Sequence, residues 1–245
     1  MGGKGRCRVG TSGWQYRHWR GPFYPAGLAT AKWLAYYAAR FDTVEVNATF
    51  YHLPREGTAA AWRAVAPPGF LYAVKASRYI THMRRLKEPA RGLEMFFERL
   101  RGLGDRMGPV LFQLPPRFPR DAGLLEDFLR ALPEGVRPVF EFRDERWLCE
   151  PVYTLLAGRN AALCIYELGG RHSPVLATAD FAYVRLHGPH ERYAGDYGPA
   201  ALRTWAERMR AWTENGLDAF CYFDNDQAGY APKNAAELKA LLEGG

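Results

Sequence analysis

Short runs of apolar, often β-branched residues recur along the chain, and they alternate with longer segments whose apolar residues are spaced as on one face of a helix. Such runs are typical of buried strands in a parallel sheet. The pattern predicts eight strands, the first over residues 8–14 and the second opening the stretch 43–51. The other predicted strands cover 70–76, 109–114, 138–143, 161–166, 183–187 and 219–224.

Helical spacing of apolar residues predicts about seven helices between these strands. Asp121 fits the N-cap of the fourth helix. Pro199 fits the first turn of the seventh helix, and Asn215–Gly216 is expected to end it. Further predicted helices cover 31–41, 58–65, 90–103 and 145–157.

Three details of the helical segments lead to specific expectations. Pro151 should make the first turns of the fifth helix irregular. Residues 169–179 show no helical periodicity, so the sixth crossover should be short or irregular. Asn234 and Glu237 resemble a capping box, which predicts that the last helix starts at Asn234.

Eight strands alternating with helices over 245 residues predict an α/β fold, a parallel eight-stranded (β/α)8 TIM-type barrel. No linker-like or low-complexity segment divides the chain, so 1–245 is expected to form one domain. The alternative is a doubly wound sheet, which normally carries a glycine-rich phosphate loop after its first strand. The stretch Gly10-Thr11-Ser12-Gly13 does not match G-x-G-x-x-G, which argues against a dinucleotide fold.

Polar residues interrupt the predicted strands late in their length, as Glu45 and Asn47 do in the second strand. Alternate strand residues point to the same face, so these two side chains should project together. Burying them is unfavourable unless something pairs with them. In a barrel the carboxyl ends of the strands converge on one mouth, where catalytic groups lie. The candidates at this mouth are Ser12, Glu45, Asn47, Lys75, Gln113, Glu141, Arg143, Arg185, His187 and Asp224.

The first functional interpretation is an enzyme that acts by acid/base chemistry on an anionic small molecule, phosphorylated or sugar-like. Glu45 or Glu141 would be the general base, and His187 or Lys75 the acid. The competing structural interpretation is that ion pairs and hydrogen bonds among these polar side chains only fill and stabilise the top of the barrel. A non-catalytic scaffold on the same fold is a third interpretation.

Further residues complete this interpretation. Arg143 and Arg185 would clamp the substrate anion bidentately, and His82 is a second candidate acid or base. Aromatic side chains would stack on a ring or base, or would form a hydrophobic lid over the mouth. These aromatic residues are Trp14, Tyr16, Trp19, Phe50, Tyr51, Tyr193 and Tyr197.

A formal net charge of +7 and a pI near 9.3 favour anionic partners, although the same charge also serves solubility. The second functional interpretation is therefore a nucleic-acid-binding or processing protein that resembles endonuclease IV-type barrels. The basic segment 78–87, with Arg17 and Arg20, would follow phosphates, and the aromatic residues would hold an extruded base.

The sequence leaves the cofactor unknown, and a divalent metal is an open alternative that is not favoured. Three cations at the same mouth, Lys75, Arg143 and Arg185, make it more natural for the carboxylates to be paired than to ligate a metal. The residues whose types would ligate a divalent ion are Glu45, Glu141, His187 and Asp224.

The cysteines and the start of the chain bear on location. None of Cys7, Cys149, Cys164 and Cys221 lies in a C-x-x-C pair, and the last two fall in apolar runs, which suggests a reducing cytoplasm. Residues 1–8 lack the apolar core of a signal peptide. No apolar run approaches the roughly 20 residues of a membrane span. We therefore expect a cytoplasmic protein without a membrane partner, and its oligomeric state is open.

A set of motifs spreads over nearly the whole chain. The motifs are Gly10–Trp14, Val44–Tyr51, Lys75 with Thr81-His82, Gln113–Pro116, Glu141–Arg143 with Trp147, Arg185–Gly188, Tyr222–Asp226, and Ala231-Pro232 with Asn234-Ala235. Together they resemble the YecE-like family, a domain of unknown function (number seventy-two). The resemblance implies a TIM barrel and implies no activity, because the family has no assigned function. It adds Asn225 to the candidate substrate-binding residues, and it leads us to expect Asn in many members where this chain has Asp224.

Overall fold

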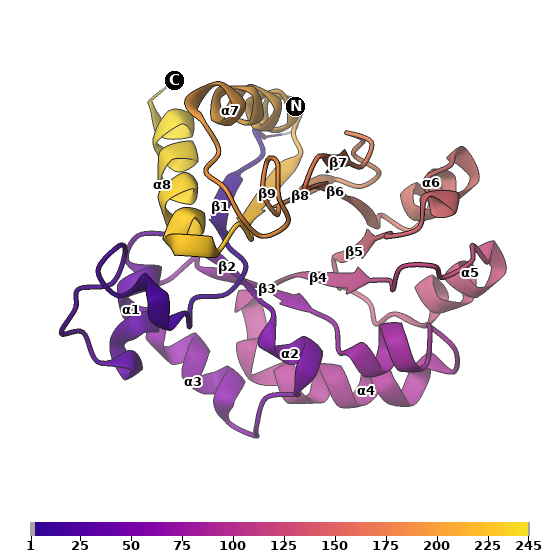
Figure 1. Cartoon of the computed structure of the whole chain (residues 1–245). Coiled ribbons are helices and arrows are strands. Elements are labelled where there is room, and N and C mark those ends of the chain that lie inside the picture. The colour runs from indigo at the N-terminus through magenta and orange to yellow at the C-terminus, as the bar shows by residue number, and fades with distance from the viewer. Residues whose placement is uncertain (1–2, 245) are drawn as a thin grey trace.

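The computed structural model describes residues 3–244 and confirms the predicted architecture: eight parallel strands form a nearly closed barrel with helices around it (Figure 1). The strands neighbour one another in the order β1-β9-β8-β6-β5-β4-β3-β2. Residues 1 and 2 of the basic N-terminal segment lie outside the described residues. The strands are β1 Cys7–Thr11, β2 Thr43–Val46, β3 Leu71–Lys75, β4 Met107–Gln113, β5 Pro138–Glu141, β6 Ala162–Leu168, β8 Phe181–Leu186 and β9 Asp218–Phe223.

The helices begin and end largely where their sequence signals predict. The Asp121 side chain caps α5 by accepting a hydrogen bond from the Leu124 N–H at 2.9 Å. Pro199 lies in the first turn of α7, which ends at the predicted Asn215–Gly216. No helix within residues 3–244 is long and apolar enough to cross a lipid bilayer. The helices are α1 Trp33–Ala38, α2 Ala48–Tyr51, α3 Thr58–Val65, α4 Pro89–Leu100, α5 Ala122–Ala131, α6 Glu150–Ala157, α7 Pro199–Glu214 and α8 Tyr230–Glu243.

Both irregular crossovers occur where the sequence predicts them. A 3-10 turn at Glu145–Trp147 precedes α6, which carries Pro151 in its first turn. After β6 the chain forms no helix. It turns back as the short strand β7 (Arg171–His172), which pairs antiparallel with the end of β6. The returning segment is then tied to β6 because the Thr178 hydroxyl accepts from the Leu163 N–H at 2.8 Å.

The predicted start of the last helix at Asn234 is wrong. α8 begins at Tyr230, and Asn234 is buried one turn inside it. Its side-chain oxygen accepts from the Tyr197 N–H at 3.1 Å and from Asn225 Nδ2 at 2.9 Å. Its amide group in turn donates to Glu237 at 3.0 Å. Asn234 and Glu237 therefore do not cap the helix. Asn234 instead hydrogen-bonds to Tyr197 and Asn225 in the neighbouring loops and to Glu237 in its own helix.

The basic segment 78–87, expected to be a plain loop, contains a π-helical turn at Tyr79–Met83. Arg85, Leu86 and Glu88 follow with φ values of 49°, 65° and 46°, the left-handed region that non-glycine residues rarely adopt. Strained backbone of this kind is concentrated at functional sites. The segment is therefore an ordered element, and it follows the end of β3 at the barrel mouth.

The barrel closes between β1 and β2 with few backbone contacts. At the mouth, the Gly13 N–H donates to the Glu45 carbonyl at 2.8 Å. Lower down, the hydroxyl of Tyr37 from α1 stands between the strands, accepting from the Thr11 N–H at 2.8 Å and donating to the Thr43 carbonyl at 3.2 Å. A tyrosine side chain therefore replaces part of the last ladder of the barrel.

Inside the barrel, a closed apolar layer supports a polar layer at the mouth. The apolar layer consists of Ala73, Leu111, Val139, Ala162, Cys164, Phe181, Tyr183, Phe220 and Tyr222, and it packs the interior as in other TIM barrels. Side chains alternate along a strand, so the next inward position lies two residues further on. Those positions are Lys75, Gln113, Glu141, Tyr166, Arg185 and Asp224.

Candidate active site

Arg185 lies at the centre of the polar layer and is only 1% exposed. Its Nε and Nη2 atoms donate to the two oxygens of Glu45 at 2.9 and 2.7 Å. Its Nη1 donates to Glu141 at 2.8 Å, and Nη2 also approaches Asp224 at 3.3 Å. Carboxylates from three other strand ends therefore accept the hydrogen bonds of the guanidinium. Arg185 has no free N–H donor for the substrate anion that it was expected to clamp.

Glu45 is fully buried and has hydrogen-bond donors on both oxygens besides Arg185. The Tyr183 hydroxyl donates to Oε2 at 2.6 Å, and the Ser12 hydroxyl donates to Oε1. Asn47 lies just beyond the end of β2, yet its amide donates to the Ser12 hydroxyl at 2.5 Å. The predicted convergence of Glu45 and Asn47 thus occurs through a shared serine.

Glu141 connects the central arginine to a second one. It is fully buried, forms an ion pair with Arg143 Nε, and accepts a long contact from Cys164 Sγ at 3.7 Å. Burial alone would raise the pKa of Glu141, but Arg143 and Arg185 outweigh it and hold that pKa well below its usual range. Glu141 is therefore a firmly ionised carboxylate and a weak base.

His187 is locked in one tautomer. Its Nε2 lies 3.1 Å from Arg185 Nη1 and 3.3 Å from Arg143 Nη2, and arginine can only donate. The proton must then lie on Nδ1, which is 2.9 Å from Asp224 Oδ2. Burial and the nearby Arg185 charge lower the pKa of His187, so the ring is neutral and fully engaged.

Lys75 differs from these groups because it is partly open and unpaired. No ion pair joins its ammonium group to an acidic side chain anywhere in residues 3–244, and its Nζ lies 4.5 Å from the centre of the Phe50 ring. Burial, and then the charge of Arg185, lower the pKa of Lys75 to about 8. In the competing structural interpretation, Lys75 would pair with a carboxylate such as Glu45 or Glu141, and the structure shows no such pair.

His82 is placed beside Lys75 by the π-helical turn. Its ring packs edge-on against the same Phe50 ring, with centroids 4.9 Å apart. Its Nδ1 lies 2.9 Å from the Thr81 hydroxyl, whose own contact to the Ser77 carbonyl is 3.5 Å. Burial and the charge of Lys75 lower the pKa of His82, which keeps the imidazole neutral.

Arg143 reaches over the mouth from the end of β5. Its side chain is 9% exposed and its guanidinium lies 5.0 Å from the centre of the Tyr166 ring. Tyr166, at an inward position of β6, is a site residue that sequence reasoning missed, because a tyrosine in an apolar run reads as core. Its late position in the strand was the available signal. Gln113, on the strand between Lys75 and Glu141, is half-buried with no side-chain hydrogen bond to a described residue.

The predicted aromatic residues fall into two groups. Tyr51 and Tyr193 are 62% and 49% exposed at the rim, and the Tyr193 ring stands 5.5 Å from His187. Tyr193 also has a left-handed backbone with φ of 62°. Trp14 and Tyr197 are buried: the first packs on Trp62, and the second accepts from the Gly188 N–H at 3.1 Å. These two support loops and do not face a substrate.

Asn225 also supports a loop. It is fully buried and donates to the Gly195 carbonyl at 2.8 Å and to Asn234 Oδ1 at 2.9 Å. Its role in this structure is to fix the segment that follows β8 against α8. Asp224, one residue earlier, faces the mouth and joins the network around Arg185.

A sequence model of the family described as "Protein of unknown function DUF72" matches residues 8–245. The chain belongs to the DUF72 family. The UPF0759 protein YunF of Bacillus subtilis is 24% identical over 269 residues, which cover 96% of this chain and 94% of YunF. The UPF0759 protein YecE of Escherichia coli K12 is 34% identical over 98 residues, which cover 40% of this chain and 36% of YecE. The resemblance to the YecE-like family is therefore confirmed.

Solved structures agree on the fold of this DUF72 protein. A DUF72 family protein from Thermotoga maritima MSB8 matches with a TM-score of 0.88 at 28% identity, covering 97% of this chain and 99% of that one. A DUF72 family protein from Enterococcus faecalis V583 matches with a TM-score of 0.82 at 16% identity, covering 97% and 95%, which speaks for the fold alone. None of these names states an activity.

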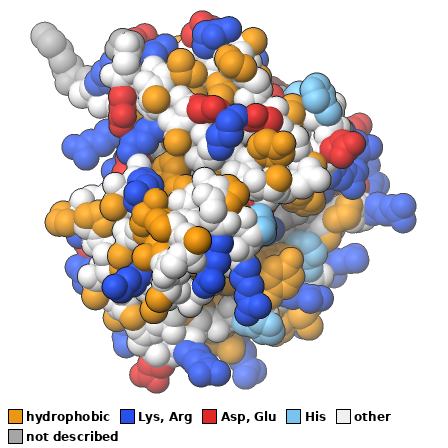
Figure 2. All heavy atoms as spheres, turned by 60° about the vertical axis from the view of Figure 1, so that its left-hand side comes forward, with side chains coloured by type: hydrophobic (Ala, Val, Ile, Leu, Met, Phe, Trp, Pro, Cys, Tyr) orange, Lys and Arg blue, Asp and Glu red, His pale blue; other side chains and the backbone are white. Residues whose placement is uncertain are grey.

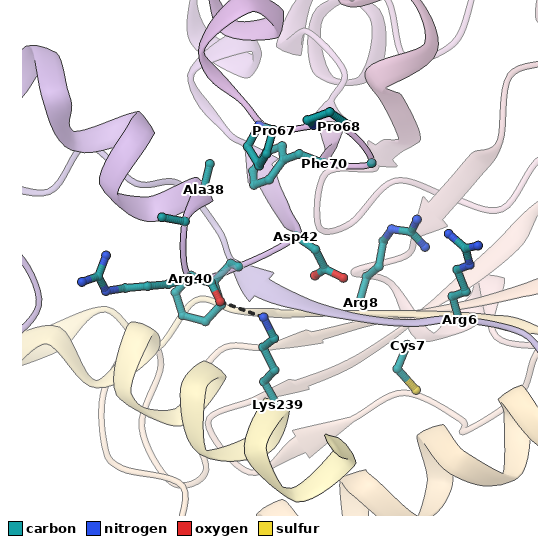
Figure 3. A pocket seen from close by; sticks show the side chains of 13 residues that line it. Arg6, Cys7, Arg8, Ala38, Arg40, Asp42, Pro67, Pro68, Phe70 and Lys239 are labelled. Carbon is teal, nitrogen blue, oxygen red and sulfur yellow. Dashed lines mark hydrogen bonds between the residues drawn. The ribbon is translucent and has the colours of Figure 1, made fainter. Parts of the chain in front are cut away.

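Residues 3–244 of this DUF72 protein contain no group of three or more His, Cys, Asp or Glu side chains arranged to hold a metal ion. The carboxylates at the mouth are instead bound to arginines. A cavity of about 510 Å³ lies at the opposite end of the barrel, where the strands begin, lined by Arg6, Arg8, Asp42 and Lys239 among others (Figure 3). That end of a TIM barrel serves stability, so the mouth is the candidate active site.

Proposed function

We propose that this DUF72 protein is an enzyme that transfers a proton to or from a small anionic substrate at the barrel mouth. The observation that carries the proposal is Lys75, a partly open ammonium group without an acidic partner in an otherwise saturated ion network. With a pKa of about 8, roughly a tenth of the molecules carry a neutral amine at pH 7, against well under a thousandth for an ordinary lysine. A proton-transfer group works best when its pKa is near the working pH.

The remaining groups have defined roles in this proposal. Arg143 binds the substrate anion, since Arg185 has no donor to spare and Arg143 Nη1 has no partner among the residues described. His82, whose ring packs on the same Phe50 ring as Lys75, exchanges protons with the bound substrate. Glu45, Glu141 and the central arginine hold the geometry. The carboxylates become supporting groups, whereas the sequence suggested that one of them was the base.

Proton exchange in heavy water tests this without knowledge of the full reaction. The protein is incubated in D₂O with a panel of small carboxylates, 2-oxo acids and phosphate esters, and loss of C–H signals is followed by NMR. We expect exchange with at least one compound, and Lys75→Met should slow it about 10²–10⁴-fold. Lys87→Met, which changes an exposed lysine of the basic segment, is the control and should keep the wild-type rate. Equal exchange by Lys75→Met and wild type would refute the role of Lys75.

Nucleic-acid binding is the second candidate, favoured by the basic side chains near the mouth. Arg78 and Arg85 are exposed on the ordered segment that carries the π-helical turn. Figure 2 shows Lys and Arg side chains around a hollow that His side chains edge. A labelled single-stranded oligonucleotide should bind weakly at low salt, with affinity falling steeply as salt rises. Arg78→Gln combined with Arg85→Gln should reduce the slope, and salt-insensitive binding would contradict the electrostatic account. A cytoplasmic location fits either function and stays a prediction.

A further inference from the structure

We infer that Lys75 forms a covalent imine with the carbonyl carbon of an anionic carbonyl compound, with 2-oxo acids as the class that fits best. The inference rests on the proposed function and names its substrate class. It follows from an unpaired amine on β3 and the Arg143 guanidinium just beyond β5, two strands away at the same barrel mouth.

The position of Lys75 sets it apart from other lysines of the chain. It follows Ala73 of the apolar layer on the inward face of β3, so its side chain points into the mouth. By contrast, Lys233 is held by Asp196 at 2.5 Å, and Lys239 donates to the Arg40 carbonyl at 2.8 Å. Burial and the charge of Arg185 favour the neutral, nucleophilic form of Lys75, while the face of the Phe50 ring, 4.5 Å from Nζ, takes the place of an anionic partner.

The carboxylates near Lys75 are not available as competing bases. Arg185 and Arg143 hold Glu141, and Arg185 with the Ser12 and Tyr183 hydroxyls holds Glu45. The amine is the reactive group that remains open. A neutral amine in such a site acts as a base or as a nucleophile, and the second role requires an electrophilic carbon held close to it.

Arg143 supplies the means to hold that carbon. Its Nε is paired with Glu141, its face lies on Tyr166, and Nη2 contacts His187 Nε2 at 3.3 Å, which leaves Nη1 without a partner among the described residues. A guanidinium binds a carboxylate or phosphate bidentately and so fixes its orientation. In a 2-oxo acid the carbonyl carbon is bonded directly to the carboxylate carbon. Lys75 and Arg143 stand on β3 and just beyond β5, separated only by β4, whose Gln113 amide can donate to the carbonyl oxygen.

The reaction balances without an added reagent. The neutral Lys75 amine attacks the carbonyl carbon, a C–N bond forms, and the C=O electron pair moves to oxygen. The nitrogen loses a proton to His82, which returns it to that oxygen. A second proton, equal to the one that Lys75 released to solvent on becoming neutral, reaches the hydroxyl through His82. The hydroxyl leaves as water while the nitrogen lone pair forms the C=N bond, and a protonated imine remains. Its positive nitrogen makes the neighbouring C–H acidic, which is the proton transfer of the proposed function.

Reductive trapping tests the inference. The protein is incubated with pyruvate, glyoxylate or dihydroxyacetone phosphate and sodium cyanoborohydride, and modified lysines are located by peptide mass spectrometry. We expect Lys75 to be modified at least tenfold faster than the exposed Lys32 and Lys87 by at least one compound. The rate at Lys75 should rise with pH around a midpoint near 8. Arg143→Met should lower the rate with the anionic probes and leave Lys32 unaffected.

Two outcomes would overturn the imine. One is modification spread evenly over the lysines with all three compounds. The other is selective modification that persists in Lys75→Arg, which would place the reaction elsewhere. If Lys75-dependent exchange in D₂O occurs without trapping, the imine fails and the proposed function stands with Lys75 as a base. If trapping is selective but Lys75→Met exchanges protons like wild type, the proposed proton transfer fails.

Discussion

The two halves of the barrel mouth treat charge in opposite ways. On the side of β8, β9, β1 and β2, Arg185, Glu45 and His187 are fully buried and are joined by ion pairs and hydrogen bonds. On the side of β3 to β5, Lys75 is partly open without an acidic partner, and Arg143, although paired with Glu141, keeps its Nη1 without a partner among the described residues. In the first half, removing any one charge would leave its buried partner unpaired. In the second half, the unpaired groups are available to bind a substrate, so this is where chemistry is expected.

The largest effect should come from removing the centre of the closed half. Arg185→Met leaves Glu45, Glu141 and Asp224 without their shared cation inside the barrel. Breaking a buried ion pair on one side typically destabilises by about 3–5 kcal/mol, because a buried charge is left uncompensated. Urea unfolding should show this as a lower midpoint with an unchanged slope. Arg130→Met, which removes an exposed helical ion pair, is the control and should change stability by under about 1 kcal/mol. An Arg185→Met variant as stable as this control would mean that the network is not structural.

A smaller effect is expected at the link between the halves. Glu141→Gln keeps the shape and leaves Arg185 its bonds to Glu45 and Asp224, so we expect a loss of about 1.5–3 kcal/mol at pH 7. The pKa of Glu141 is lowered in the folded state, so its contribution is complete above about pH 4.3, the unfolded value, and is lost as pH falls toward the folded value. Wild type should therefore lose more stability than Glu141→Gln between pH 7 and pH 3. Parallel pH profiles for the two proteins would show that Glu141 is not the group being protonated.

The smallest effect on stability, with the opposite sign, is expected for Lys75→Met in the open half. The pKa of Lys75 is lowered on folding, so the charged amine weakens the folded state below pH 8, and this penalty fades as pH rises from 8 to about 10.4. Lys75→Met should match or exceed wild-type stability at pH 7, by up to about 2 kcal/mol, since groups kept for function are often unfavourable for stability. The difference should shrink toward pH 10. Denaturation midpoints of both proteins across this range provide the measurement, and a difference that is constant with pH would contradict the lowered pKa.

The sequence predicts the fold, and the meeting of polar side chains at the mouth, well because both depend on repeated patterns. The barrel follows from the alternation of strands and helices. The mouth follows from polar residues recurring late in buried strands, and Glu45, Glu141 and His187 do meet there. The sequence also predicts the irregular sixth crossover, because residues 169–179 lack the apolar spacing of a helix.

What the sequence does not reveal is which polar residue takes which partner. Arg185 and Arg143 look alike in sequence. In the structure, buried partners accept from all the nitrogen atoms of Arg185, whereas Nη1 of Arg143 has no partner among the described residues. Tyr166 looks like core and faces the site, while Tyr197 looks like a lid and supports a loop. Asn234 has the spacing of a helix cap but is buried within α8. Each difference arises from contacts between residues distant in sequence, which local patterns do not encode.

The tyrosine between β1 and β2 also bears on the order in which the chain folds as it is synthesised. β1 leaves the ribosome first, but its ladder partner β9 is made last, with Cys7 opposite Ala219. Contacts between such distant segments form slowly. Until β9 exists, β1 has only β2 as a neighbouring strand, and the Tyr37 hydroxyl supplies much of that connection. We therefore expect refolding of Tyr37→Phe, followed by stopped-flow fluorescence, to be slower than that of the wild type, with little change in the final architecture.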